Sequence, residues 1–231
     1  MNAAVASLAA FYRSSIGKKM VVALTGLALI GFLFGHMAGN LKIYFGAEKL
    51  NSYAAWLHSM PAVLWGARLG LLACFAAHIV TTVLLVKQNR AARETAYAYK
   101  ATVQATGASR TMFWSGIIII SFVIYHLMHF TLRVGNEYGG ESYIDAAGRH
   151  DVFKMVVDGF SWVPASAFYI FSMALLCWHL SHGFASVFQT LGLRTERSWP
   201  IIKGAGYAAA LILFVGNCSI PIAVLSGLVK Y

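Results

Sequence analysis

Long apolar runs, separated by shorter polar segments, dominate the pattern of the chain. A run of about 18 or more apolar residues can cross the hydrocarbon core of a bilayer as a helix. There the backbone must satisfy its own hydrogen bonds, and a helix does so. The sequence predicts five transmembrane helices, over about 20–40, 62–86, 112–132, 161–188 and 204–228. We therefore predict an all-α membrane bundle that forms a single domain over residues 1–231.

Two segments outside these runs have distinct patterns. The longest connection, 133–159, is polar and rich in glycine, and we predict that it forms a small cap on the outer side. Residues 1–17 have no basic leader before their apolar stretch and so make a poor signal peptide. That stretch is too short to span and is expected to lie in the membrane interface.

The composition agrees with a membrane protein. Hydrophobic residues make up 59% of the 231 residues and charged residues only 11%, against roughly 25% charged residues in soluble domains. The formal net charge of +10 would suggest nucleic acid in a soluble protein. Here most basic residues lie in short loops, where they set topology and contact lipid headgroups, so we expect no nucleic-acid partner. Cys74, Cys177 and Cys218 lie singly inside apolar runs, which indicates buried thiols rather than disulfides or an iron–sulfur cluster.

The distribution of basic residues predicts the orientation. Eleven of them fall on the side of the N-terminus: Arg13, Lys18, Lys19, Lys87, Arg90, Arg93, Lys100, Arg110, Arg194, Arg197 and Lys203. The other side receives Lys42, Lys49, Arg133, Arg149, Lys154, Lys230 and, near the start of the second helix, Arg68. The excess places the N-terminus in the cytoplasm and the C-terminus outside, in a multi-pass protein of the inner (cytoplasmic) membrane.

Six of the eight histidines lie inside the predicted spans: His36, His78, His126, His129, His179 and His182. An ionisable side chain inside the bilayer is costly, so each is a functional candidate. A lone histidine of this kind is more often a neutral imidazole that is hydrogen-bonded to a neighbouring helix. Histidines on four of the five helices favour a functional role.

Helix geometry sorts four of these histidines into two levels. Measured from the cytoplasmic end of each helix, His36 lies at roughly 24 Å and His126 at roughly 21 Å. His78 lies at roughly 12 Å and His182 at roughly 9 Å. A haem iron with two axial imidazoles needs one histidine on each side at nearly equal depth. The levels therefore predict two b-type haems, and they fit less well with a tetrahedral zinc site, whose ligands cluster.

Small residues are compatible with this prediction. Gly31, Gly35 and Gly39 recur every four residues on the first helix, and Gly66 and Gly70 do so on the second. Such spacing is also typical of close helix packing. Missing side chains make room either for a neighbouring helix or for the edge of a porphyrin.

These residues together resemble a known family over nearly the whole chain. The chain is similar to the cytochrome b membrane anchor of diheme succinate:quinone oxidoreductases, the class with one five-helix anchor that includes menaquinol:fumarate reductases. The resemblance is carried by four segments: Thr25-Gly26-Leu27 through Gly35-His36-Met37, Ala77-His78, Tyr125-His126-Leu127, and His182-Gly183.

The resemblance implies a ligand set. His36 and His126 would hold the distal haem on the outer side, and His78 and His182 the proximal haem nearer the catalytic subunits. His129 and His179 each lie three residues from one of these ligands, so depth does not separate them. The family pattern prefers His126, which is followed by leucine, and His182, which is followed by glycine. The other two are expected to bond a haem propionate or the backbone.

The resemblance also implies the function and partners. The chain would anchor a flavoprotein and an iron–sulfur subunit, and pass electrons through two haems to a quinone, with menaquinone expected, in the respiratory chain and the tricarboxylic acid cycle. Succinate or fumarate chemistry would take place on a partner, so no catalytic residue is expected here. Quinone candidates follow the first helix: Asn40, Lys42, Tyr44, Glu48, Asn51, Tyr53, Trp56 and His58. An ordinary interfacial loop would also explain them.

One departure and several alternatives remain. Some diheme fumarate reductases carry a glutamate two positions before the ligand of the fourth helix, where this chain has Leu180, which puts a transmembrane proton route of that kind in doubt. Arg110 and Arg194 either pair with proximal propionates or mark the membrane boundary. The chain could also be the diheme cytochrome b of a hydrogenase or formate dehydrogenase, or a transporter with a histidine proton relay.

Overall fold

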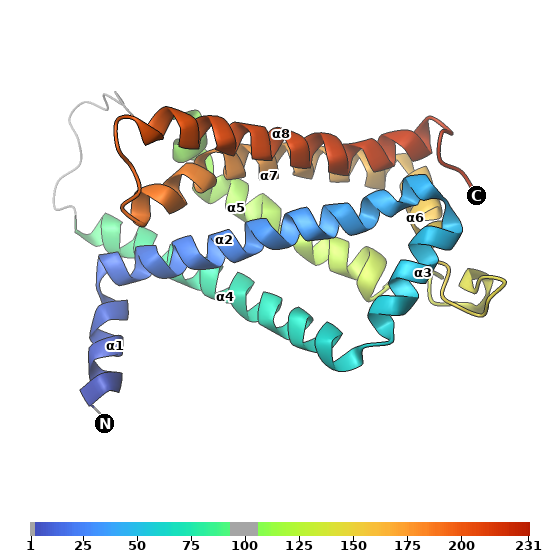
Figure 1. The fold of residues 1–231 in the computed structure, drawn as a ribbon, viewed down its shortest axis with the longest axis horizontal. Coiled ribbons are helices and arrows are strands. Elements are labelled where there is room, and N and C mark those ends of the chain that lie inside the picture. The colour runs from blue at the N-terminus through green and yellow to red at the C-terminus, as the bar shows by residue number, and fades with distance from the viewer. Residues whose placement is uncertain (1–2, 93–105) are drawn as a thin grey trace.

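The computed structural model describes residues 3–92 and 106–231, and this part of the chain is built from helices (Figure 1). Its long apolar stretches are Ser15–Phe45, Pro61–Ala91, Gly107–Thr131, Val163–Thr190 and Ser198–Leu225. Each is long and apolar enough to cross a membrane. The predicted all-α fold with five spans is confirmed, although several helices begin up to six residues before the predicted position.

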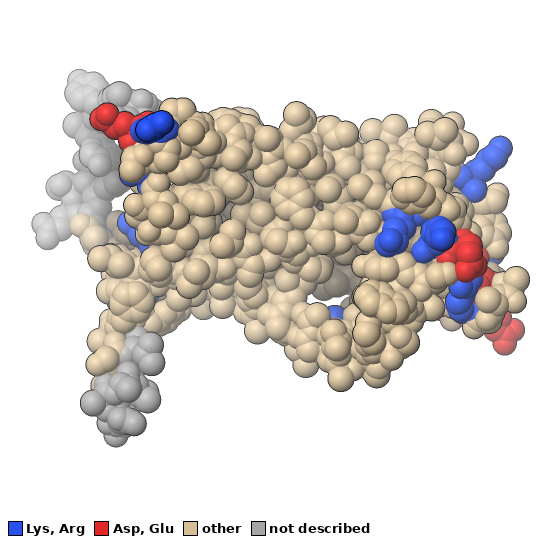
Figure 2. All heavy atoms as spheres, viewed as in Figure 1, with Lys and Arg blue, Asp and Glu red and all other residues tan. Residues whose placement is uncertain are grey.

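Consecutive spans run in opposite directions along the long axis (Figure 1). They are α2 (Ser15–Asn40), α4 (Pro61–Ala91), α5 (Gly107–His126), α7 (Val163–Thr190) and α8 (Ser198–Leu225). In Figure 2, charged side chains gather near the two ends of the molecule, and the broad band between them is almost free of charge. This distribution is the one expected of a bundle that crosses a membrane. Of the basic residues used to predict orientation, Arg93 and Lys100 lie outside the described residues.

Helix α1 (Ala3–Arg13) precedes α2 at a sharp corner, and Figure 1 shows it projecting sideways from the bundle. Ser14 caps α2, because its side chain accepts a hydrogen bond from the backbone nitrogen of Gly17 at 2.9 Å. A Cβ atom at position 17 would clash with the carbonyl oxygen of Phe11, so only glycine permits this close approach. Tyr12 then reaches α4, where its hydroxyl lies 3.1 Å from Oγ1 of Thr81.

Two further helices form an outer layer that the hydropathy pattern did not predict. After the 3₁₀ turn Leu41–Phe45, helix α3 (Ala47–His58) lies between α2 and α4 in the chain. The predicted loop 133–159 contains the short 3₁₀ turn Glu141–Tyr143 and most of helix α6 (Val152–Ser161). Helix α6 is amphipathic and buries Phe153, Met155, Val157 and Phe160. The outer cap is therefore a packed layer rather than a plain loop.

Hydrogen bonds from Asn51 hold this layer together. Asn51 is 2% exposed. Its Nδ2 donates to Oδ1 of Asp151 at 3.0 Å, and its Oδ1 accepts from the backbone nitrogen of Phe153 at 3.0 Å. Asp151 in turn caps α6 by accepting from the nitrogen of Lys154 at 2.9 Å. One buried amide thus ties α3 to the start of α6.

Packing is uneven across the bundle. Helix α7 buries nine residues and packs along α8, whereas α4 buries only Thr81. Within the described part of the chain, α4 packs closely on α2 and α3 but not on α5 or α7. In Figure 1, α4 diverges from α2 toward the outer end, and Figure 2 shows a hollow in the surface on that side. Helices α7 and α8 form a densely packed wall, and α4 is attached to the bundle mainly through α2.

We predict that Asn51→Ala destabilises the protein by about 1–3 kcal/mol, because Asp151 and the amide of Phe153 would lose their buried partner. Denaturant unfolding of the detergent-solubilised protein measures the loss. Asn217→Ala is the matched control, since Nδ2 of Asn217 bonds only Leu213 of its own helix. An equal effect of the two substitutions would contradict a special role of Asn51.

Candidate functional site

The outer level contains a close pair of histidines from two different spans. His36 on α2 and His126 on α5 lie with their ring centroids 5.6 Å apart and their planes nearly perpendicular, at 87°. A metal ion held by two imidazoles needs about 2.0–2.1 Å to each nitrogen, which places the two rings at a comparable separation. Within the described residues, His36 has no hydrogen-bond partner; it stacks on Phe32 at 5.2 Å. The two imidazoles that depth assigned to the outer level thus lie in edge-to-face contact.

Tyr169 on α7 forms a hydrogen bond with His126, the second ring of this pair. Its hydroxyl oxygen lies 3.2 Å from Nδ1 of His126 and also 3.2 Å from Nδ1 of His129. His129 belongs to a π-helical turn, Leu127–Thr131, that continues α5. Such turns occur often at functional sites. The structure therefore places His129 behind His126, on the far side of a shared hydroxyl.

The inner level is built around His78 on α4. Nδ1 of His78 lies 3.0 Å from Oγ1 of Thr25, which itself donates to the carbonyl oxygen of Val21 at 2.6 Å. Nδ1–H of His78 therefore donates to Thr25. A Cβ atom on Gly26 would come within 3.3 Å of the imidazole, so a small residue is needed where α2 and α4 meet at this ring.

Helix α7 presents two histidines at the inner level. Nε2 of His182 lies 3.1 Å from Oγ of Ser186 on the same helix. His179 instead uses Nδ1, which lies 3.0 Å from Oγ of Ser115 on α5. The described residues show no ring contact between His78 and either of them. In His179, as in His78 and His126, Nδ1 is the nitrogen bonded to a hydroxyl. In His182 the bonded nitrogen is Nε2, so its hydrogen bond with Ser186 must break before Nε2 can bind a metal.

Open space adjoins several of the predicted small positions. A Cβ atom on Gly31, Gly35, Gly66 or Gly70 would meet no heavy atom within 4 Å, and the same holds for Gly183 beside His182. These glycines are therefore not helix-packing contacts among the described residues. Gly39 is different, because a Cβ atom there would lie 3.0 Å from the ring of Tyr53. Of the two explanations for the glycine pattern, packing accounts only for Gly39.

The eight quinone candidates do not converge on one pocket. Glu48 and Asn51 serve the outer layer, through Arg149 and Asp151 respectively. Tyr53 contacts two of the other candidates: Lys42 lies over its ring at 5.0 Å, and Trp56 stacks on it. His58 bonds its own helix, and Asn40 ends α2. Tyr44 lines a separate cavity of about 380 Å³. At the end of the bundle that carries α1, Arg194 lies over the ring of Trp199 at 4.4 Å, and Arg110 is exposed.

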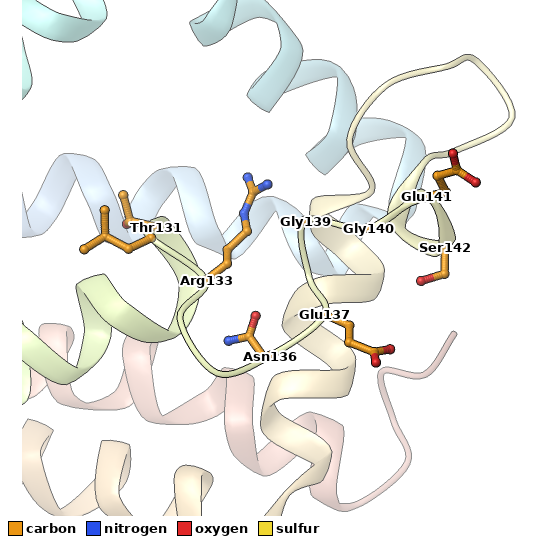
Figure 3. Close-up of a pocket in the computed structure, with 9 residues that line it drawn as sticks. Thr131, Arg133, Asn136, Glu137, Gly139, Gly140, Glu141 and Ser142 are labelled. Carbon is orange, nitrogen blue, oxygen red and sulfur yellow. The ribbon is translucent and has the colours of Figure 1, made fainter.

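Sequence analysis missed a larger cavity of about 690 Å³ on the outer side, lined by residues of the segment 131–142 (Figure 3). Arg133 and Asn136 belong to its lining. Arg133 has a left-handed backbone, with φ of 55°, which is uncommon for a residue other than glycine. Its Nε is buried and finds no hydrogen-bond partner in the structure. Burial lowers the pKa of this guanidinium from its usual value. The sequence around Arg133 gave no indication of this site, because a basic residue at the end of a span is typical of a membrane boundary.

An ion-pair network joins two segments of the outer layer. Nη1 and Nη2 of Arg149 donate to the two carboxylate oxygens of Glu48 at 3.0 and 2.6 Å. Nε of Arg149 donates to Oδ2 of Asp145 at 2.8 Å. Hydrogen bonds from Arg149 and then Ser52 lower the pKa of the Glu48 carboxyl from 4.5 to about 2. A carboxyl with a lowered pKa stabilises the folded form above its ordinary pKa, and this contribution is lost as pH falls through the lowered value.

We predict that Glu48→Gln loosens the outer layer at neutral pH, because the charged pair with Arg149 is lost. Hydrogen exchange of segments 47–53 and 145–153 should be faster in the variant than in the wild type at pH 7. The difference should shrink below pH 4.5 and vanish once the pH is well below 2, where Glu48 of the wild type is itself protonated. A difference that does not depend on pH would show that the charge is not responsible.

Comparison with known proteins adds no relative to this picture. No protein-family model, no curated protein and no solved structure matches the chain. The site and its chemistry therefore rest on the residues themselves: an edge-to-face pair of imidazoles at the outer level, three further imidazoles at the inner level, and hydroxyl groups that bond Nδ1 of His78, His126 and His179 and Nε2 of His182.

Proposed function

We propose that the chain is the membrane anchor and electron-transfer subunit of a succinate dehydrogenase or fumarate reductase, and that it holds two b-type haems. The observation that carries this proposal is the outer pair, in which His36 and His126 approach from separate spans to a centroid distance of 5.6 Å. Two imidazoles from different helices are the ligand set of a low-spin b-type haem.

The donor set and the space around it fit a haem. His36 lacks a protein partner among the described residues, although an unpaired imidazole is costly in an apolar setting. His78 and His126 have their Nδ1 atoms bonded to hydroxyls, which leaves Nε2 for a metal. The hollow beside α4 offers space for a flat macrocycle, and Gly31, Gly66 and Gly183 add no side chain that would fill the space next to their helices.

The residues of this chain have three tasks in the proposal. His36 and His126 hold the distal haem, and His78 with His182 hold the proximal haem. Thr25 and Tyr169 accept from Nδ1–H, which fixes the tautomer and raises the basicity of the opposite nitrogen. The apolar spans exclude water, which is one way in which a protein sets a redox potential. When bound, the haems supply one-electron transfer between an iron–sulfur cluster and a quinone.

The two ends of the bundle take different partners in the proposal. The flavoprotein and iron–sulfur subunits dock at the end that carries α1 and the basic residues, which faces the cytoplasm. Quinone, with menaquinone expected, binds toward the outer end, where both the predicted candidates and the cavity lined by Arg133 lie. Arginine and tyrosine side chains there can donate hydrogen bonds to quinone oxygens.

Single replacements of ligands test the haem assignment. His36→Ala should delete the distal haem and spare the proximal one, and His78→Ala should do the reverse, because each removes one axial ligand. Haem content and the reduced-minus-oxidised optical spectrum measure both. His58→Ala is the matched control and should keep both haems, since that histidine is exposed and bonds Ala54 of its own helix. The pairing is wrong if neither replacement removes a haem.

Identification of the co-purifying subunits tests the partner assignment. We expect a succinate-type flavoprotein together with an iron–sulfur protein, because this chain offers electron transfer but no site for succinate chemistry. Mild detergent extraction followed by mass spectrometry of the intact complex gives the answer. An iron–sulfur partner accompanied by a hydrogenase or formate dehydrogenase subunit would favour the alternative diheme cytochrome.

A further inference from the structure

The hydroxyl of Tyr169 lies between two histidines at equal distances. It is 3.2 Å from Nδ1 of His126 and 3.2 Å from Nδ1 of His129, and Tyr169 is buried, with 7% of its surface exposed. Edge-to-face contacts with Phe122 and Phe160, at centroid distances of 5.1 and 4.9 Å, hold its ring. The hydroxyl is therefore fixed in the middle of the bridge.

Counting protons shows that the two histidines cannot both accept a hydrogen bond from the hydroxyl at Nδ1. A tyrosine hydroxyl has one proton to donate, and its oxygen accepts from the other side. If it donates to Nδ1 of one neutral histidine, it must accept from Nδ1–H of the other. In the arrangement that also uses the hydroxyl proton within the bridge, one ring carries its proton on Nδ1 and has a free Nε2, and the other carries its proton on Nε2.

The surroundings of the two rings decide which is which. His126 lies in edge-to-face contact with His36, at a centroid distance of 5.6 Å. His129 packs instead against Phe130, at a centroid distance of 4.0 Å, and over Gly159, where a Cβ atom would lie 3.3 Å from its Cε1. His126 is therefore the ring that needs a free Nε2. In this arrangement Nδ1–H of His126 donates to Tyr169, and the hydroxyl of Tyr169 donates to Nδ1 of His129.

We propose that Tyr169 is a positioning residue for the distal haem: through this bridge it holds His126 in the ligating tautomer and makes it a stronger donor to ferric iron, while it keeps His129 out of the ligand set. The inference rests on the proposed function. It assigns a role to a residue of α7 that is not itself a ligand. It also explains why His126 and His129, three positions apart on one helix, have different roles.

The outer end of the bridge is also fixed. The backbone carbonyl of His129 accepts from Nδ2 of Asn136 at 3.1 Å, and Asn136 lines the outer cavity. The bridge therefore links the distal ligand with the segment that closes the outer face. A change of the hydroxyl should be felt at the distal haem and not at the proximal level, where Thr25 and Ser115 hold other histidines.

Potentiometric titration of both haems in the purified complex tests the inference with Tyr169→Phe. Loss of the acceptor weakens the donation of His126 to ferric iron, so the ferric–ferrous equilibrium of the distal haem should shift about tenfold toward the ferrous form. For a one-electron couple, this corresponds to a rise in midpoint potential of about 59 mV. The electron paramagnetic resonance signal of the distal ferric haem should move as well, and the proximal haem should keep its potential.

Tyr125→Phe is the matched control. Tyr125 belongs to the same aromatic cluster, 5.9 Å from Tyr169, and its hydroxyl makes no hydrogen bond within the described part of the chain. It should leave both potentials unchanged. An unchanged distal potential in Tyr169→Phe, or an equal shift of both haems, would overturn the inference. A wild-type complex with no b-type haem would instead overturn the proposed function, so the two failures are distinguishable.

His129→Gln provides a second test if Tyr169→Phe fails to assemble. Glutamine keeps a hydrogen-bond acceptor next to Tyr169 and removes the imidazole, so both haems should be retained with at most a small shift of the distal potential. Loss of the distal haem in this variant would show that His129 is the ligand and would reverse the proposed bridge.

Discussion

An imidazole inside a membrane must find a partner, and this constraint organises the interior of the bundle. Unpaired polar groups are expensive in hydrocarbon. Five of the six histidines within the spans meet the constraint through a neighbouring hydroxyl: Thr25 for His78, Tyr169 for both His126 and His129, Ser115 for His179, and Ser186 for His182. His36 has no such partner among the described residues and lies in edge-to-face contact with His126. In our proposal, iron completes this arrangement.

The uneven packing of the bundle also bears on how the histidines are held. Helices α7 and α8 bury their apolar side chains against one another, and the outer layer is tied down by Asn51 and Arg149. Helix α4 carries His78 yet contributes little to this core, because its inner side faces a hollow and not a neighbouring helix. A cofactor that binds His78 from α4 and a histidine from α7 would join α4 to the densely packed wall. Cofactor binding and stability of the bundle should then be coupled.

The sequence was sufficient for the features that depend on local pattern. Hydropathy placed the five spans, because length and apolar character alone decide whether a helix can cross a bilayer. Helical rise placed His36 and His126 at one level, and the structure shows their rings side by side. Both results follow from quantities that each segment carries by itself.

Features that depend on distant contacts were not accessible in this way. The bridge through Tyr169 joins residues about 40 positions apart, and Asn51 finds its partners about 100 positions away. Helices α3 and α6 are short and amphipathic, so no hydropathy threshold detects them. Hydrogen-bond partners also decide how His179 and His182 differ, which depth cannot do. Glu48 and Asn51 were predicted as quinone candidates because they are polar and interfacial, and nothing in the sequence indicated the contacts by which their side chains hold the outer layer together.

The ratio of haem to protein in the purified chain or complex tests the central claim most directly. Two b-type haems per chain, with the absorption bands of low-spin iron held by two histidines, are the predicted result. A single haem would contradict the two-level arrangement of imidazoles, and a preparation without haem would contradict the proposed function as a whole.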